Sequence, residues 1–98
     1  MDWRDDQDLK QFLKAVLTLE NEQEALRFFQ DVCTIKELTD MAKRLEAARM
    51  LAQGKNYREV TQATGMSTAT ISRVNRCLVY GEGGYRDALK KMGAADEA

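Results

Sequence analysis

The chain has 98 residues, of which 44% are hydrophobic and 32% are charged, and its formal net charge is −1. This length fits a single domain, and the composition is typical of a folded globular protein rather than a disordered chain. The acidic start MDWRDDQDLK does not resemble a secretory signal, and no apolar run reaches the roughly 18 residues of a membrane span. We therefore expect a cytoplasmic protein with no membrane association.

The residue types needed for common catalytic and metal chemistry are scarce. There is no histidine, and the two cysteines, Cys33 and Cys77, do not form a C-x-x-C pair. Neither a zinc site nor a Ser-His or Cys-His nucleophile can be assembled from this set. We expect no enzyme activity, no catalytic residue and no bound metal, and both cysteines should be small buried apolar side chains.

Two amphipathic helices are predicted within residues 1–33. The apolar residues of the first recur at helical spacing and are Leu9, Phe12, Leu13, Val16 and Leu17. Asn21 is the predicted N-cap of the second helix, with Glu24 as its capping-box partner. The apolar face of this helix consists of Ala25, Phe28, Phe29 and Val32. So short a chain offers no obvious helix to cover this surface, so we expect these to be dimerisation helices.

A long central helix is predicted over residues 34–54. Thr34 and Glu37 have the spacing of a capping box, and Gly54 is a left-handed stop. The predicted inward stripe of this helix is Leu38, Met41, Leu45, Ala48 and Ala52. Two shorter helices are expected in residues 56–80 and a last one over residues 85–92, which gives one all-α domain of six helices.

Residues 56–80 have the spacing of a helix-turn-helix. Asn56 and Ser67 predict the N-caps of its two helices, and Gly65 supplies the positive φ that the tight turn requires. The two helices can bury each other through Val60, Met66, Ile71 and Val74. Thr61 and Thr64 stand where a smaller or an apolar residue would be more usual.

With those residues turned inward, the second motif helix exposes short hydroxylated side chains followed by arginines. The short side chains of its first turn suit base edges in a major groove, and the later serine and arginines suit bases or phosphates. Two basic residues around the first motif helix suit the backbone. The predicted DNA-contacting residues are Lys55, Arg58, Ser67, Thr68, Ala69, Thr70, Ser72, Arg73 and Arg76.

The charge distribution agrees with this prediction. Residues 41–80 carry seven basic and two acidic side chains, whereas residues 1–40 carry ten acidic and five basic ones. A basic block inside an acidic chain is expected when one face meets phosphate and the rest stays soluble.

Around ATISR (69–73), the sequence resembles the tryptophan repressor superfamily, and most of all its smaller YerC/YecD branch. The resemblance runs over roughly residues 26–90. Its most specific elements are the Thr34 cap, Arg44, Gly54, RE (58–59), Gly65 and ATISR. It implies a six-helix, intertwined homodimer that binds double-stranded DNA as a regulator of transcription, a bacterial repressor, partly through water-mediated base contacts. Such a dimer would prefer a palindrome with half-sites about one helical turn apart.

The resemblance also implies a low-molecular-weight ligand site at Thr34, Arg44 and Arg73, where the two arginines could clamp a carboxylate. Val74 stands where the repressor has a glycine, and its isopropyl group would crowd an indole ring, so we do not expect tryptophan as corepressor. Another small-molecule corepressor stays open. Arg44 could instead pair with Asp40, four residues earlier, or with a DNA phosphate.

Two alternatives to an unregulated DNA-binding protein stay open from the sequence. The helix-turn-helix could serve as a protein-protein interaction module, for which the acidic N-terminal half would be suited. The regulator could also be gated by a small-molecule ligand other than tryptophan.

Overall fold

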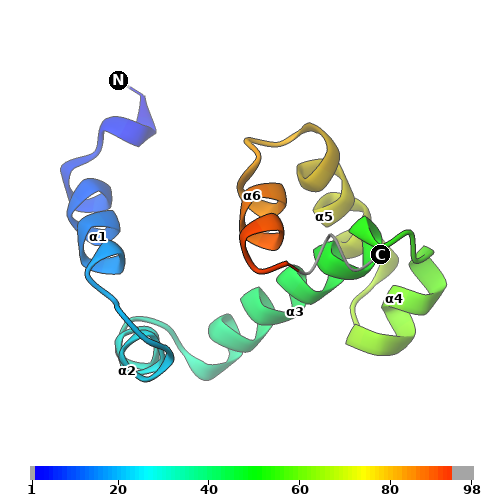
Figure 1. The fold of residues 1–98 in the computed structure, drawn as a ribbon, viewed down its shortest axis with the longest axis horizontal. Coiled ribbons are helices and arrows are strands. Elements are labelled where there is room, and N and C mark those ends of the chain that lie inside the picture. Colours follow the sequence, from blue (N-terminus) through cyan, green and yellow to red (C-terminus); the bar gives the residue numbers. More distant parts are fainter. Residues whose placement is uncertain (1, 94–98) are drawn as a thin grey trace. The chain divides into compact units, whose positions relative to one another are not determined.

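A computed structural model describes residues 2–93 of the chain. Over these residues it contains a short 3-10 helix, six α-helices and no strand (Figure 1). Their bounds are Trp3–Asp5 for the 3-10 helix η1, then Gln7–Leu17 for α1, Glu22–Val32 for α2, Ile35–Ala52 for α3, Tyr57–Thr64 for α4, Thr68–Tyr80 for α5 and Gly84–Lys91 for α6. The predicted all-α fold of six helices is confirmed.

Side-chain caps mark the starts of α1 to α5, whereas Gly83 precedes α6 without a side-chain cap. Thr34 and Glu37 form a reciprocal capping box, in which the Glu37 N–H donates to the Thr34 hydroxyl at 3.1 Å and the Thr34 N–H donates to the Glu37 carboxylate at 2.9 Å. These hydrogen bonds lower the pKa of Glu37 below its ordinary value. Asn21 also caps its helix as predicted, but the carboxylate of Glu24 accepts instead from the Glu20 N–H at 2.9 Å.

The chain divides into two compact units after Leu38, within α3. In the first unit, α1 and α2 pack through three phenylalanines. The ring centroid of Phe12 lies 5.8 Å from that of Phe28 and 6.5 Å from that of Phe29. None of residues 2–38 is fully buried, and Leu17 and Ile35 are 84% and 82% exposed. The apolar faces of α1 and α2 are therefore only partly covered within one chain.

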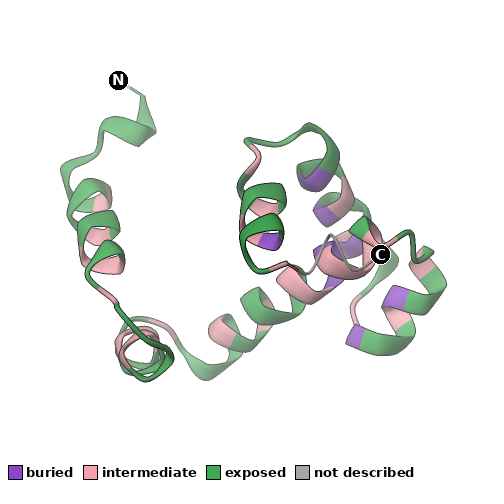
Figure 2. Cartoon of the chain, viewed as in Figure 1, coloured by how far each residue is buried: buried purple, intermediate pink, exposed green. Residues whose placement is uncertain are grey.

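The second unit holds all of the fully buried side chains among residues 2–93 (Figure 2). Its core consists of Ala47, Ala48, Val60, Ile71, Val74, Leu78 and Leu89. α3 contributes two small side chains, Ala47 and Ala48, to this core. The predicted inward set Val60, Ile71 and Val74 is fully buried, and Met66 packs partly buried against the core.

Two expectations about burial are wrong. Met41 and Ala52 belong to the predicted inward stripe of α3, but both are exposed, because the buried face of this helix centres on Ala47 and Ala48. Cys77 is exposed on α5, at the edge of the buried stripe rather than on it, and Cys33 is half-buried.

The two unexpected threonines of α4 differ in how their hydroxyls are satisfied. The buried Thr64 hydroxyl donates to the Val60 carbonyl at 2.7 Å and accepts from the Met66 N–H at 3.2 Å. It therefore ties the end of α4 to the turn that follows. The Thr61 hydroxyl is buried too, but it has no hydrogen-bond partner among the residues that the structure describes.

We predict that Thr61→Ala stabilises the protein, whereas Thr64→Ala destabilises it. Removing the unpaired Thr61 hydroxyl relieves a desolvation penalty and improves helix propensity, so the free energy of unfolding should rise by about 1 kcal/mol. Removing the Thr64 hydroxyl leaves the half-buried Met66 N–H without its acceptor and should cost about 1–3 kcal/mol. Urea unfolding of the two variants measures both effects, and equal destabilisation would show that the Thr61 hydroxyl has a partner.

Candidate nucleic-acid interface

The turn between α4 and α5 consists of residues 65–67 and begins at a left-handed glycine. Gly65 has φ +72°, and its N–H donates to the Thr61 carbonyl at 2.8 Å, which ends α4. Ser67 then caps α5 by accepting from the Thr70 N–H at 3.2 Å. The turn is short because Gly65 changes the direction of the chain and Ser67, two residues later, caps the next helix.

This turn leaves one face of α5 open to solvent. Its exposed residues include Thr68, Ala69, Ser72, Arg73 and Arg76. At 3.6 residues per turn they span about 140° of the helix circumference. The opposite face is buried in the core through Ile71, Val74 and Leu78. The helix therefore presents short side chains at its N-terminal end and two arginines farther along, as the sequence predicts.

Thr70 is less exposed than the other predicted DNA-contacting residues of α5. It is half-buried, and its hydroxyl oxygen is 3.0 Å from that of Ser67. Both hydroxyls are thus engaged in the cap of α5. The predicted base contact of Thr70 stays a prediction, and in this structure the residue helps to position the start of the helix.

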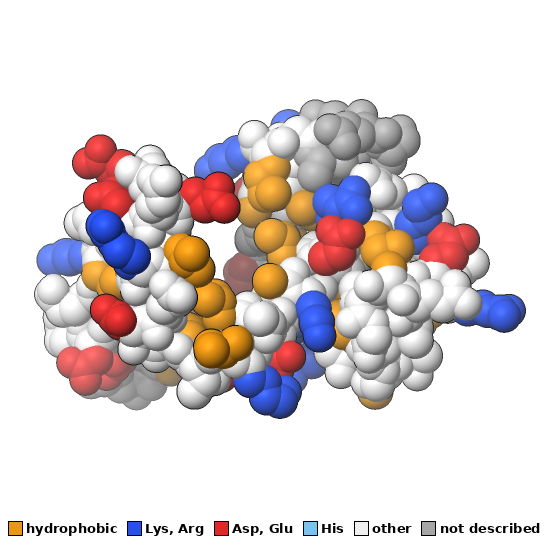
Figure 3. Space-filling view, turned by 90° about the horizontal axis from the view of Figure 1, so that it is seen from below, with side chains coloured by type: hydrophobic (Ala, Val, Ile, Leu, Met, Phe, Trp, Pro, Cys, Tyr) orange, Lys and Arg blue, Asp and Glu red, His pale blue; other side chains and the backbone are white. Residues whose placement is uncertain are grey.

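Basic side chains surround the helix-turn-helix without acidic partners. Lys55, in the α3–α4 loop, and Arg58, in the first turn of α4, are both exposed. Within residues 2–93, no ion pair is made by Lys43, Arg44, Lys55, Arg58, Arg73 or Arg76. Figure 3 shows several Lys and Arg side chains on this unit, with Asp and Glu side chains among them. By contrast, Arg49 donates twice to Glu46, each time at 2.7 Å, which lowers the pKa of Glu46.

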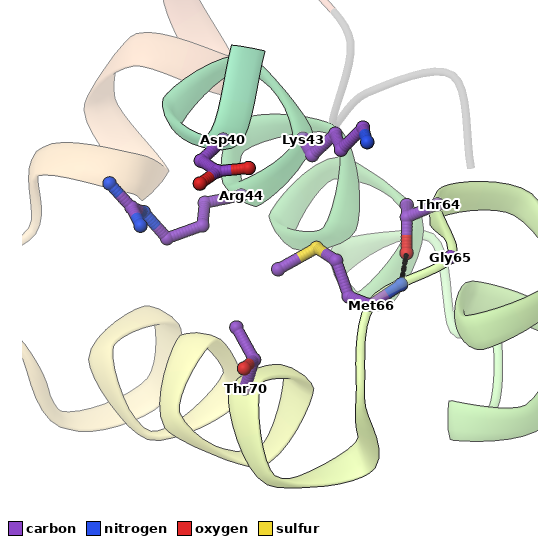
Figure 4. A pocket seen from close by; sticks show the side chains of 7 residues that line it. All are labelled: Asp40, Lys43, Arg44, Thr64, Gly65, Met66 and Thr70. Carbon is purple, nitrogen blue, oxygen red and sulfur yellow. Dashed lines mark hydrogen bonds between the residues drawn. The ribbon is translucent and has the colours of Figure 1, made fainter. Parts of the chain in front are cut away.

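Two open pockets meet at Arg44 and Thr70. The first, of about 260 Å³, lies between α3 and the turn and is lined by Asp40, Lys43, Arg44, Thr64, Gly65, Met66 and Thr70 (Figure 4). The second, of about 420 Å³, is lined by Arg44, Thr70, Arg73, Val74, Cys77 and Tyr85. Arg44 lines both pockets and forms no ion pair with Asp40 in the described chain.

The structure thus brings together two of the three predicted ligand residues, Arg44 and Arg73. Thr34 belongs to the first unit, where its hydroxyl serves the capping box of α3. Sequence reasoning missed Lys43, Cys77 and Tyr85 as neighbours of these pockets. One sequence signal could have found Lys43 and Cys77, because residues three or four apart share a face of a helix. Lys43 has this spacing with residue 40, and Cys77 has it with residues 73 and 74.

Other kinds of site are not seen among residues 2–93. No three histidine, cysteine or acidic side chains gather where they could hold a metal ion. None of the described helices combines the length and apolar character that crossing a bilayer requires.

The comparisons with known proteins agree with this geometry. A sequence profile of the Trp repressor protein matches residues 7–93. The chain belongs to the Trp repressor family. Members of this family are regulatory DNA-binding proteins rather than enzymes, so the predicted resemblance is confirmed, and with it the broad class of DNA-binding regulator.

Individual relatives of the Trp repressor family match most of the chain. YerC of Bacillus subtilis is 48% identical over 85 residues, which cover 87% of this chain and 82% of YerC. A crystal structure of a TrpR-like protein from Eubacterium eligens has a TM-score of 0.89 and 43% identity, and the match covers 92% of this chain and 93% of that one. A Staphylococcus aureus protein, named as a candidate Trp repressor, has a TM-score of 0.85 and 42% identity, with coverages of 89% and 87%.

We predict that Gly65→Val disrupts the helix-turn-helix, because a β-branched residue resists positive φ. The cost should be about 1–3 kcal/mol of unfolding free energy, and DNA affinity should fall with it. Gly84→Ala is the matched control, since Gly84 has no positive φ and a Cβ there would meet nothing within 4 Å. That variant should be as stable as the parent or slightly more stable. Full stability and DNA affinity in Gly65→Val would show that the turn does not need a left-handed residue.

Proposed function

We propose that this protein is a dimeric, sequence-specific repressor of transcription, which binds a palindromic DNA site through α5 and acts in the cytoplasm. The observation that carries the proposal is the exposed face of α5, set in a surface whose cations lack acidic partners. Unpaired cations attract phosphate, and a helix with short side chains at its exposed N-terminal end can approach base edges.

The residues divide by the part of DNA that they would contact. Thr68 and Ala69 lie in the first turn of α5 and would face base edges. Ser72, Arg73 and Arg76 would contact bases or phosphates, with Thr70 and Ser67 holding the start of the helix against them. Lys55 and Arg58 would bind the backbone as α4 crosses it.

Dimer formation is supported by the incomplete core of the first unit. Its phenylalanine cluster is only half-buried, and further apolar side chains are largely exposed. The exposed set in residues 2–38 includes Trp3, Leu13, Leu17, Leu26, Val32 and Ile35. A second copy of the chain would cover such a surface and bring a second α5 to the DNA. Two copies would then occupy successive major grooves, about 10 bp apart.

A small-molecule effector is the second candidate role, and the pocket between Arg44 and Arg73 favours it. Two unpaired guanidinium groups at one pocket suit a carboxylate or phosphate ligand. Val74 lines the same pocket, which argues against an indole ring there. A thermal-shift series with tryptophan and other carboxylates tests this role, since a ligand at about 100 times its Kd adds roughly 2.7 kcal/mol of stability.

Selection of bound duplexes from a random pool by the purified protein is the direct test of the main proposal. We expect an enriched palindrome with half-sites one helical turn apart. If the protein bound no duplex in a salt-dependent way but captured a protein partner, the helix-turn-helix would be an interaction module instead.

We predict that Arg58→Ala weakens binding to all DNA sequences about equally. Loss of one phosphate contact in each subunit should reduce the slope of log affinity against log salt by about two for the dimer. Fluorescence anisotropy at several salt concentrations measures this slope. Arg27→Ala, an exposed arginine on α2, is the control and should leave it unchanged. A loss of affinity confined to one operator base would contradict the backbone role of Arg58.

We predict that Leu17→Lys converts the dimer to a monomer, because it places a charge where α1 would be covered by the second copy. Sedimentation equilibrium should give twice the chain mass of 11.1 kDa for the parent protein and the single mass for the variant. The exposed Ala63 of α4 lies outside this surface, so Ala63→Lys should remain dimeric. A monomeric parent protein would refute the dimer.

A further inference from the structure

The first turn of α5 has fewer hydroxyl groups available for DNA than its sequence suggests. The hydroxyls of Ser67 and Thr70 lie 3.0 Å apart, and the Ser67 oxygen also accepts from the Thr70 N–H. Thr70 is moreover half-buried. The exposed groups that remain in this part of the helix belong to Thr68, Ala69 and Ser72.

The side chains of this segment can distinguish only some bases by direct contact. Among the exposed residues of α5 from Thr68 to Arg76, none is Asn, Gln, Asp or Glu, and Asn75 in this range is half-buried. No exposed side chain of this range can therefore make the bidentate amide contact to adenine or the carboxylate contact to the cytosine amino group. Arg73 and Arg76 only donate, so their base partner would be guanine through its N7 and O6 atoms.

The side chain of Ala69 is a single methyl group, so an apolar contact is the only one that it can make with a base. In the major groove the complementary feature is the 5-methyl group of thymine, the one apolar substituent that a base pair presents there. Ala69 is exposed in the first helical turn, and its exposed neighbours Thr68 and Ser72 are short, so the helix can come close enough for methyl contact. Arg73 starts about 6 Å farther along the helix axis, where a longer side chain is needed.

We propose that Ala69 is a specificity-determining residue that selects thymine in each half-site by contact with its 5-methyl group. The inference rests on the proposed function, because it concerns the DNA that α5 would bind. It predicts a half-site in which thymine occupies the position under the start of α5 and guanine the position reached by the arginines.

Replacement of thymine by uracil tests this proposal, since uracil lacks only the methyl group and keeps every hydrogen-bonding group. The probe is the duplex that the parent protein enriches from a random pool, with each thymine replaced in turn. One thymine in each half-site should be sensitive. Its replacement should weaken binding about fourfold in one half-site and about fifteenfold in both, from about 0.8 kcal/mol for each buried methyl. The remaining thymines serve as internal controls.

A double-mutant cycle assigns the effect to Ala69. In Ala69→Gly the preference for thymine over uracil at the sensitive position should disappear, whatever the variant costs in overall affinity. Ala63→Gly is the matched control, because it removes the methyl of an exposed helical alanine outside α5 and should keep the full preference.

The outcomes separate this inference from the proposed function. If a palindrome is enriched but no replacement by uracil changes affinity, or if Ala69→Gly keeps the preference, methyl recognition by Ala69 is refuted and the DNA-binding regulator stands. If no duplex is enriched at all, the proposed function fails, and this inference fails with it.

Discussion

The hydrogen bonds at the end of α4 set how α5 leaves the turn, and so which face of α5 is exposed. Gly65 accepts a left-handed conformation, and the Thr64 hydroxyl links the Val60 carbonyl to the Met66 N–H across the same corner. With this corner in place, Ile71, Val74 and Leu78 enter the core, and the opposite face of α5 is left exposed. The buried hydroxyl of Thr64 therefore stabilises the turn and does not destabilise the core.

The basic side chains that the structure describes fall into two groups, those bound to acidic side chains of the same chain and those without an acidic partner. Arg49 is bound to Glu46 by two short hydrogen bonds, whereas the cations around the helix-turn-helix have no such partners in residues 2–93. Grouped like charges repel each other and favour association with a polyanion, which releases counterions when it binds. The acidic N-terminal region keeps the net charge of the whole chain near zero, so the basic surface is a local property.

The two units also differ in how their stability is achieved. The second has a set of fully buried side chains from α3, α4, α5 and α6, while residues 2–38 have none. Helices as short as α1 and α2 are marginal in water unless their apolar faces are covered. Under the dimer proposal, the order of the first unit would depend on association, and the apparent stability of the protein would rise with its concentration.

The sequence alone determined the helix positions and the place of the turn. Thr34, Asn56 and Ser67 act on backbone groups within three residues, and Gly65 acts through its own φ, so these signals do not depend on the rest of the fold. The exposed face of α5 could be predicted for the same reason, from the apolar positions that had to turn inward.

Only the tertiary structure decided which face of α3 is buried and which side chains meet across helices. An alanine-rich helix offers several similar faces, and the crossing of its neighbours selects Ala47 and Ala48 over Met41 and Ala52. The approach of Arg44 to Arg73 joins distant parts of the chain, and no local pattern encodes it. The exposure of Cys77 and the burial of the Thr61 hydroxyl likewise follow from packing between helices, which spacing along one helix does not specify.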